Sequence, residues 1–312
     1  MNDFTQLGTI SEQISSLGIG TWAWGDRRFW GYGTDYNISD IREAFVTTIS
    51  QGINFLDTAE VYGNGLSEKI VASLVQEYGC QIVIATKFFP YPWRWRAVDF
   101  RKALLNSFKR LNIKQVHLYQ IHWPFPPLPI EKWVNCLADA YEEGLVQAVG
   151  VSNYNADQLQ RAHDTLSKRN IPLASNQVPY SLINRKIEKN GVVQICKERN
   201  IRIIAYSPIG QGLLTGKYSE NNPPTGARRF LYSKNFLRKL PPLHEKLKEI
   251  GEAHGGKTPA QVALNWVICK DAIPIPGAKN AKQANENAGA LGWRLSQEEV
   301  QVLDQMSDLL QQ

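Results

Sequence analysis

Asp57, Lys87 and His122 each stand at the end of a short apolar run, and Tyr62 follows Asp57 by five residues. A phenol has an ordinary pKa of about 10, but a neighbouring ammonium stabilises the phenolate and lowers that pKa. A buried lysine in turn needs a carboxylate partner to keep its charge. We therefore expect Tyr62 to act as a general acid beside Lys87, with Asp57 as the counter-ion. His122 would orient a carbonyl oxygen or assist the proton transfer.

This set of side chains predicts a carbonyl reduction, in which hydride reaches carbon and a proton reaches oxygen. No side chain donates hydride, so a nicotinamide cofactor is implied. A metal-dependent hydrolase would need His, Asp and Glu ligands clustered at the strand ends. The sequence has no such cluster, and no metal is expected.

Each of the four residues also has a structural explanation when it is considered alone. Asp57 could cap a helix, Tyr62 could be packing, and Lys87 could be a surface charge at a strand end. His122, next to Trp123, could be a loop histidine whose hydrogen bonds are satisfied. The catalytic prediction depends on the four residues occurring together.

The elements that must position these residues alternate between short, β-branched-rich runs and longer amphipathic ones. The predicted strands are Gly18–Trp22, Ile53–Asp57, Gln81–Lys87, Val116–His122, Val146–Ser152, Leu173–Gln177, Ile201–Tyr206 and Ala272–Ile275. The predicted helices between them include Ser39–Gln51 with Ser39 as N-cap, Val98–Leu111, Ile130–Glu143, Ala156–Lys168, Ile187–Glu198 and Ala260–Cys269. Eight strands, each followed by a helix, predict an α/β fold closed into a (β/α)8 TIM barrel.

Two features lie outside the repeat. A short N-terminal β-hairpin is expected within "TISEQISSLGIGTW", and a long glycine- and proline-bearing loop follows the seventh strand between Ser207 and Leu240. A loop of that length in a compact domain is usually functional. No linker divides the chain, so residues 1–312 are expected to form a single domain.

Side-chain alternation along the strands predicts where the polar residues lie. Successive side chains of a strand point to opposite faces, and in six consecutive strands one face ends in a polar residue. These residues are Asp57, Lys87, His122, Ser152, Gln177 (in step with Leu173 and Ser175) and Tyr206. In a closed parallel barrel these positions converge on the mouth, where active sites lie. Strand ends that merely meet solvent would carry mixed polar residues without this chemical relationship.

The composition excludes several other classes of protein. The 312 residues are 43% hydrophobic with a net charge of +6, and no apolar run approaches the roughly 20 residues of a membrane span. Basic patches at Trp93–Arg96 and Ala227–Lys234 favour a solvated rim or a small-anion site over nucleic acid. The four separated cysteines and the absence of a signal-peptide pattern predict a reducing, cytoplasmic location.

Several motifs occur in an order that is similar to the aldo-keto reductase superfamily, in its bacterial and chloroplast-type branch. The resemblance extends from about Leu17 to Met306 and includes "FLDTAEVYGNG", "IATK", "LYQIHWP", "VGVSN", "NQVPYS", "AYSPIGQGLLTGKY" and "IPIPGAK". It implies NADPH-dependent reduction of aldehydes or ketones to alcohols by a TIM barrel, with Asp57, Tyr62, Lys87 and His122 as the catalytic residues. It also implies a cofactor-covering role for the long loop after the seventh strand.

The resemblance also implies how each part of the cofactor is held. Ser152, Asn153 and Gln177 would bind the nicotinamide carboxamide, and Tyr206 would stack under the ring. Lys279 would meet a 2′-phosphate, which with Lys282 favours NADPH over NADH. The residues expected to contact the cofactor are Thr21, Trp22, Asp57, Ser152, Asn153, Gln177, Tyr206, Ser207, Pro208, Ile209, Gly210, Gly212, Leu213, Lys217, Gly277, Ala278, Lys279, Gln283, Glu286 and Asn287.

Three positions depart from the pattern of the family. Gln283 stands where many relatives have an arginine, Gln120 is polar where an aliphatic residue is usual, and His117 replaces a common acidic residue. The sequence offers no physical explanation for the last two.

Aromatic residues predict the substrate-binding wall, although any one of them could instead pack the barrel rim. Trp24, Trp30, Phe88, Trp93 and Trp123 follow strands whose loops would share one mouth, which suits a bulky or aromatic small-molecule carbonyl compound. The nearby basic residues that could favour an anionic substrate are Arg94, Arg96, Arg228 and Arg229.

A cofactor-sensing regulatory subunit with slow or vestigial reductase activity is the alternative function. No helix carries an extended heptad seam, so the sequence leaves the oligomeric state open and is compatible with a monomer.

Overall fold

A computed structural model of the chain describes residues 3–125, 128–224 and 232–311. Eight parallel strands follow one another in chain order around a single sheet. They are β3 (Ile19–Gly20), β4 (Phe55–Asp57), β5 (Val83–Phe88), β6 (Val116–Ile121), β7 (Val146–Ser152), β8 (Leu173–Pro179), β9 (Arg202–Tyr206) and β10 (Ala272–Pro274). The sheet closes because Gly18 N donates to Pro274 O at 3.0 Å and Gly20 N to Pro276 O at 3.0 Å. The predicted (β/α)8 barrel is confirmed.

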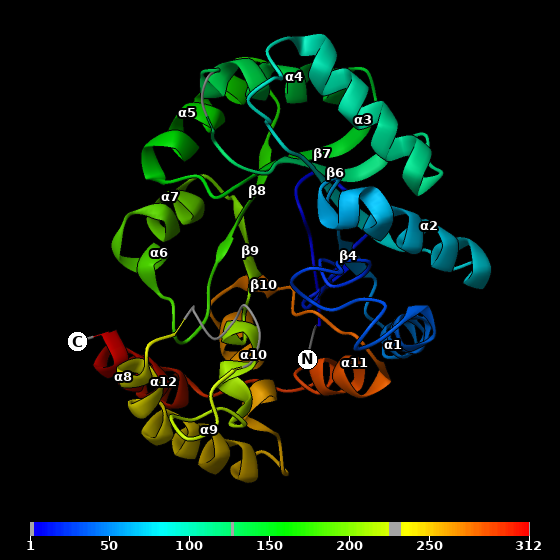
Figure 1. Ribbon diagram of the computed structural model, residues 1–312. Helices are drawn as coiled ribbons and strands as arrows, with labels where there is room; N and C mark the ends of the chain where they lie inside the picture. The colour runs from blue at the N-terminus through cyan, green and yellow to red at the C-terminus, as the bar shows by residue number, and fades with distance from the viewer. Residues whose placement is uncertain (1–2, 126–127, 225–231, 312) are drawn as a thin grey trace.

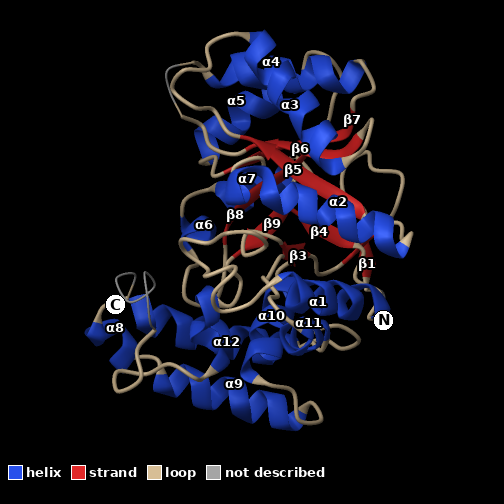
Figure 2. Cartoon of the chain, turned by 45° about the vertical axis from the view of Figure 1, so that its right-hand side comes forward, coloured by secondary structure: helices blue, strands red, loops and turns tan. Residues whose placement is uncertain are grey.

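Helices surround the strands, as Figure 1 shows. They are α1 (Ile38–Ser50), α2 (Leu66–Tyr78), α3 (Ala97–Leu111), α4 (Ile130–Glu142), α5 (Ala156–Ser167), α6 (Lys186–Lys189), α7 (Val192–Glu198), α8 (Lys234–Arg238), α9 (Pro241–Ala253), α10 (Pro259–Cys269), α11 (Ala281–Ala288) and α12 (Gln297–Gln311). Figure 2 shows α8, α9 and α12 in a tier beyond the strands. None of the helices in the described ranges is long and apolar enough to cross a membrane.

A small antiparallel hairpin, β1 (Phe4–Thr5) with β2 (Ile14–Ser15), precedes the barrel. The apolar side chains of this segment, among them Leu7 and Ile14, pack against residues of the barrel interior such as Phe55. Gly8 allows the close approach, because a Cβ atom there would lie 2.4 Å from the Cβ of Ala174. The side chains of this segment therefore fill one end of the barrel interior. The active site must lie at the other end.

Two helix predictions are corrected. The N-cap of α1 is Asn37 and not Ser39, because the Asn37 side chain accepts from Ser39 N while the Asp40 carboxylate accepts from Asn37 N. The single helix predicted over Ile187–Glu198 is two helices, since Gly191 has a φ of 85° and separates α6 from α7.

The predicted alternation along β8 is wrong for Leu173. The pairing of β7 with β8 shifts, so that Val149 faces Leu173 but Gly150 faces Ser175. This irregularity sends Leu173 into the outer core and Ala174 into the barrel interior. After this irregularity, Gln177 pairs with Ser152 at the carboxyl end of the neighbouring strand β7. The two predicted site residues therefore lie side by side.

The segment after β9 contains a 3-10 helix, η2 (Gly210–Thr215), followed by α8. Ser207 opens it with a left-handed φ of 50°, a conformation uncommon for a residue with a side chain. Of the arginines predicted to favour an anionic substrate, Arg228 and Arg229 fall outside the described residues.

Candidate active site

Lys87 lies at the centre of the polar residues at the carboxyl ends of the strands. Its ammonium is fully buried and lies 2.5 Å from Asp57 Oδ1. It also donates to the carbonyl of Thr58 at 2.8 Å and to Tyr62 Oη at 3.4 Å. An ammonium has three donors, and all three are directed to oxygen atoms of the Asp57–Tyr62 segment.

Tyr62 begins a short 3-10 helix, η1 (Tyr62–Gly65), five residues after the last residue of β4. The backbone must pass close to a neighbouring loop here, because a Cβ atom on Gly63 would lie 2.7 Å from Gly25 O. The Tyr62 ring packs edge-on against His122, with ring centroids 5.8 Å apart, and stacks on Trp22 at 6.2 Å. The structure thus brings Asp57, Tyr62, Lys87 and His122 into one cluster.

The electrostatics of the cluster correct one expectation. Burial, followed by the negative charge of Asp57, raises the pKa of the Tyr62 phenol well above its ordinary value. The direction is the reverse of the lowering expected from Lys87, because in this state of the protein burial of the phenol and the charge of Asp57 outweigh the neighbouring ammonium. Burial also lowers the pKa of Lys87, against the opposing effect of Asp57.

His122 is neutral in this environment. Burial, and to a lesser extent the charge of Lys87, holds the pKa of its imidazole well below the ordinary value. Its Nδ1 atom is buried and makes no hydrogen bond with any residue of the described ranges. A neutral imidazole carries one ring N–H, which can donate to an oxygen atom of a ligand.

Two buried amides lie beneath the cluster. Gln177 Nε2 donates to Asp57 Oδ2 at 2.8 Å, and Gln120 Nε2 donates to the same oxygen at 3.2 Å. Sequence reasoning assigned no role to Gln120, although it shares the strand face of His122. The signal was the polar residue itself, in a strand position facing the barrel interior.

Ser152, Asn153 and Tyr206 form a second polar group beside His122. Ser152 Oγ donates to Gln177 O at 2.9 Å, and Tyr206 Oη donates to Asn153 Oδ1 at 2.9 Å. Asn153 has a φ of 64° and donates from Nδ2 to His122 O at 3.1 Å. These contacts bring the predicted carboxamide-binding residues next to the cluster of Tyr62.

Lys279 lies at the entry to α11. Its ammonium donates to Trp30 O at 3.0 Å and sits over the rings of Trp30 and Tyr36, at 4.9 and 4.6 Å from their centroids. Gln283 Oε1 accepts from Lys279 N, and Asn287 Nδ2 donates to Gly277 O. The Glu286 carboxylate accepts from the hydroxyl of Thr258.

Gly277 and the segment after β9 leave exposed backbone and positive charge where a dinucleotide could bind. Gly277 is exposed, and a Cβ atom there would meet only Gly20 O at 3.7 Å. The exposed Lys217 carries its ammonium over the Tyr218 ring at 4.7 Å. An open backbone and two lysines, Lys217 and Lys279, are compatible with a negatively charged ligand.

Three residues predicted to touch the cofactor have buried side chains, so only their backbone atoms could face it. Thr21 is fully buried and donates from its hydroxyl to Asp57 O at 3.0 Å, so it holds the backbone of Asp57. The side chains of Leu213 and Ala278 are fully buried in the core around the barrel. The carbonyl of Ala278 is also used, as it accepts from Trp24 Nε1 at 2.8 Å.

Two residues predicted to line the substrate pocket do not reach it. Trp24 is buried against Phe45, and Phe88 packs between Phe100 and Trp133 in the layer outside the barrel. The next residue, Phe89, instead packs edge-on against His122 at 5.6 Å. Because alternate strand residues face opposite sides, a shift of one position exchanges the core for the mouth.

The other aromatic residues lie in the loops near the mouth. Trp30 packs on Trp22, whereas Trp93 is 69% exposed and stacks on Tyr91 at 4.5 Å. Trp123 stacks on Phe125. Phe29, which was not predicted, stacks on Trp22 at 5.0 Å.

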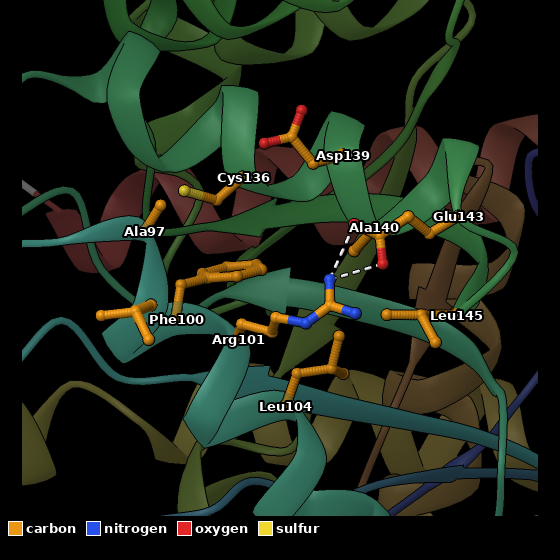
Figure 3. Close-up of a pocket in the computed structure, with 10 residues that line it drawn as sticks. Ala97, Phe100, Arg101, Leu104, Cys136, Asp139, Ala140, Glu143 and Leu145 are labelled. Carbon is orange, nitrogen blue, oxygen red and sulfur yellow. Dashed lines mark hydrogen bonds and ion pairs between the residues drawn. The ribbon is translucent and has the colours of Figure 1, made fainter.

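A surface hollow between α3 and α4 is remote from this chemistry (Figure 3). It is lined by apolar residues including Phe100, Leu104 and Cys136, with Arg101 hydrogen-bonded to Glu143 across it. None of the residues of the catalytic cluster lines it.

The chain was compared with known proteins. Residues 16–308 match the model of the aldo/keto reductase family. A chloroplastic pyridoxal reductase of Arabidopsis thaliana is 43% identical over 96% of this chain and 84% of that protein. The structure of a glycerol dehydrogenase from Gluconobacter oxydans has a TM-score of 0.86 and 28% identity, over 97% of this chain and 94% of that one.

A structure of an aldo-keto reductase from Klebsiella pneumoniae in complex with NADPH has a TM-score of 0.75 and 26% identity, over 98% of this chain and 96% of that one. The match to the family model and the 43% identity cover nearly the whole barrel. The chain therefore belongs to the aldo/keto reductase family and is an NAD(P)H-dependent oxidoreductase.

Proposed function

We propose that the protein reduces aldehydes or ketones to alcohols with NADPH, using Tyr62 as the proton donor. The observation that carries this proposal is the position of the Lys87 ammonium, 2.5 Å from Asp57 Oδ1 and 3.4 Å from Tyr62 Oη. A buried ammonium between a carboxylate and a phenol suits a reaction in which the phenol loses its proton. The adjacent neutral His122 supplies a further hydrogen-bonding group.

Each residue of the cluster has a separate role in the proposed reduction. NADPH, when bound, supplies the hydride. Tyr62 gives its phenolic proton to the carbonyl oxygen, and the Lys87 ammonium stabilises the phenolate that forms. Asp57 keeps Lys87 charged in its buried position, and His122 donates an N–H to the same carbonyl oxygen. Loss of one such donor typically costs on the order of 10²–10³ in rate.

The cofactor would be held by the second polar group and by the loops around it. Ser152, Asn153 and Gln177 offer amide and hydroxyl groups to the nicotinamide carboxamide, and Tyr206 offers an aromatic face. Their contacts next to His122 support this assignment. Binding would require these side chains to exchange some of their present hydrogen bonds for bonds to the cofactor.

NADPH is proposed over NADH because of Lys279. The ammonium of Lys279 lies at the start of α11, where it can meet an anionic group, and Lys282 is exposed in the first turn of the same helix. A 2′-phosphate binds such lysines as point charges. The NADPH complex of the Klebsiella pneumoniae relative supports this choice.

For the substrate we propose a neutral aromatic aldehyde. Trp22, Phe29 and Phe89 surround Tyr62 and His122 and form an apolar wall. The name of the Arabidopsis thaliana relative makes pyridoxal the first compound to test. The prediction of an anionic substrate loses support, because Arg94 is paired with Glu60.

The test is a panel of carbonyl compounds, including pyridoxal, followed by NADPH consumption. Turnover by the wild-type protein and none by Tyr62→Phe would support the proposal. Tight NADPH binding without turnover of any compound would instead favour the cofactor-sensing regulatory role.

A further inference from the structure

Both oxygen atoms of the Asp57 carboxylate accept hydrogen bonds from side chains inside the barrel. Its Oδ1 atom binds the Lys87 ammonium, whereas its Oδ2 atom accepts from the amides of Gln177 and Gln120 at 2.8 and 3.2 Å. Gln177 Nε2 also lies 3.4 Å from Gln120 Oε1, so the two amides form one connected group with Asp57. Because a carboxylate only accepts, the amide NH2 group of Gln120 must face it.

Gly150 on the neighbouring strand leaves room inside the barrel for the Gln120 side chain. Gln120 pairs with Lys87 on β5 and with Gly150 on β7, so the three lie in one row across the strands. A Cβ atom on Gly150 would lie 3.0 Å from Gln120 Cγ and 2.5 Å from Ser175 Oγ. The glycine therefore leaves the room that a long polar side chain needs at this level of the barrel.

We propose that Gln120 is a positioning residue of the reaction, which fixes the second oxygen of Asp57 and thereby sets the pH at which Lys87 loses its charge. The proposal rests on the function proposed above. When Lys87 releases its proton, a lone buried carboxylate remains, and the Gln120 amide stabilises that carboxylate. Without the amide, a lone carboxylate beside a neutral Lys87 amine is less stable than the ion pair of ammonium and carboxylate. The pKa of Lys87 therefore rises, and Lys87 keeps its proton to higher pH.

The other groups that face Lys87 do not replace Gln120 in this role. The titratable or charged groups around the ammonium are Asp57, Tyr62, His122 and the more distant Glu68. Among the described residues, Asp57 Oδ2 accepts from the amides of Gln177 and Gln120 and not from Tyr62 or His122. Gln177 alone would hold that oxygen if Gln120 were replaced.

The variant Gln120→Met tests the inference, because methionine has a similar length and no donor. We expect kcat/KM for reduction to fall about tenfold, the effect of losing one hydrogen bond to a charged group. We also expect the high-pH decline of kcat/KM to move to higher pH. The control is Ile121→Val, a fully buried neighbour on β6 that packs in the outer core.

A second measurement does not depend on activity. In protein labelled with 13C at the lysine ε-carbon, the Lys87 resonance, assigned with Lys87→Met, reports the titration of its ammonium directly. We expect that titration to move to higher pH in Gln120→Met and to stay in place in Ile121→Val. If the wild-type protein reduces no carbonyl compound, the proposed function fails while this resonance still tests Gln120. An unchanged Lys87 titration in Gln120→Met would overturn the inference, even if the rate fell through a general loss of packing.

Discussion

Arg94 and Glu60 form a bidentate ion pair, which joins the loop that follows β5 to the loop that carries Tyr62. The guanidinium Nη1 lies 2.5 Å from Glu60 Oε1, and Nη2 lies 3.0 Å from Oε2. Glu60 Oε1 also accepts from Phe89 N at 2.7 Å. Glu60 stands two residues before Tyr62, so the pair ties the proton donor to the aromatic wall beside His122.

Arg94→Met is therefore expected to lower kcat/KM several-fold for neutral and anionic aldehydes alike, because it loosens the Tyr62 loop. The control is Arg96→Met, since the Arg96 side chain is 76% exposed and pairs with Asp99 in the following helix α3. Parallel rate measurements with a neutral and a carboxylated benzaldehyde check the prediction. A selective loss of the anionic substrate in Arg94→Met would return Arg94 to substrate recognition.

Tyr62→Phe should retain NADPH binding and lose reduction. The substitution removes the hydroxyl while keeping the ring that stacks on Trp22, so the aromatic wall persists. General acid catalysis contributes about 10²–10⁴-fold, and a loss of that order is expected in kcat. Single-turnover rates with NADPH titrated by fluorescence separate binding from chemistry. Tyr78→Phe, on α2 and packed on Phe45, is the matched control. A rate within a few-fold of wild type would mean that another group delivers the proton.

Lys279→Met should weaken NADPH binding by at least about tenfold while leaving NADH nearly unchanged, because only NADPH carries the 2′-phosphate. Dissociation constants for the two cofactors, measured side by side, give the ratio. Lys102→Met, an exposed lysine on α3 with no role in the site, is the control for the loss of one positive charge. Equal weakening of both cofactors would show that the 2′-phosphate is recognised elsewhere.

Alternation along the strands made the centre of the site predictable. Asp57 and Lys87 were placed on one face from the sequence, because the side-chain period of a strand is two and the ends of parallel strands converge. The same rule failed at Leu173, where an irregular pairing changes the face without a mark in the local pattern of residue types. At Phe88 the rule holds, because Phe88 has the parity opposite to Lys87, whereas Phe89 shares the parity of Lys87 and lies at the mouth.

The role of Gln120 illustrates what sequence reasoning could not supply. Its partner, the second oxygen of Asp57, comes from another strand 63 residues away, and only the register of the barrel brings the two together. His117 is similar, since its Nδ1 accepts from the backbone N of Ile84 on the next strand. In both residues the polar type was visible, and the contact that explains it was not.

The rate of reduction should depend on pH because three groups must each be in a particular protonation state. Tyr62 must be protonated, Lys87 charged and His122 neutral. The pKa of Tyr62 is raised and that of Lys87 is lowered from 10.5, so on raising the pH Lys87 loses its proton first. We therefore expect kcat/KM for reduction to decline below pH 10.5, through the pKa of Lys87.

On lowering the pH, the same profile should stay flat through 6.5, because burial holds the pKa of His122 well below that value. Alcohol oxidation needs the Tyr62 phenolate, and its rate should rise with pH over the range in which reduction is constant. Log kcat/KM against pH, measured in both directions, checks these signs. In Lys87→Arg, whose guanidinium does not titrate, the decline at high pH should disappear even though the rate is lower. A break near 6.5 that His122→Asn abolishes would instead show that the imidazole titrates in a solvated site.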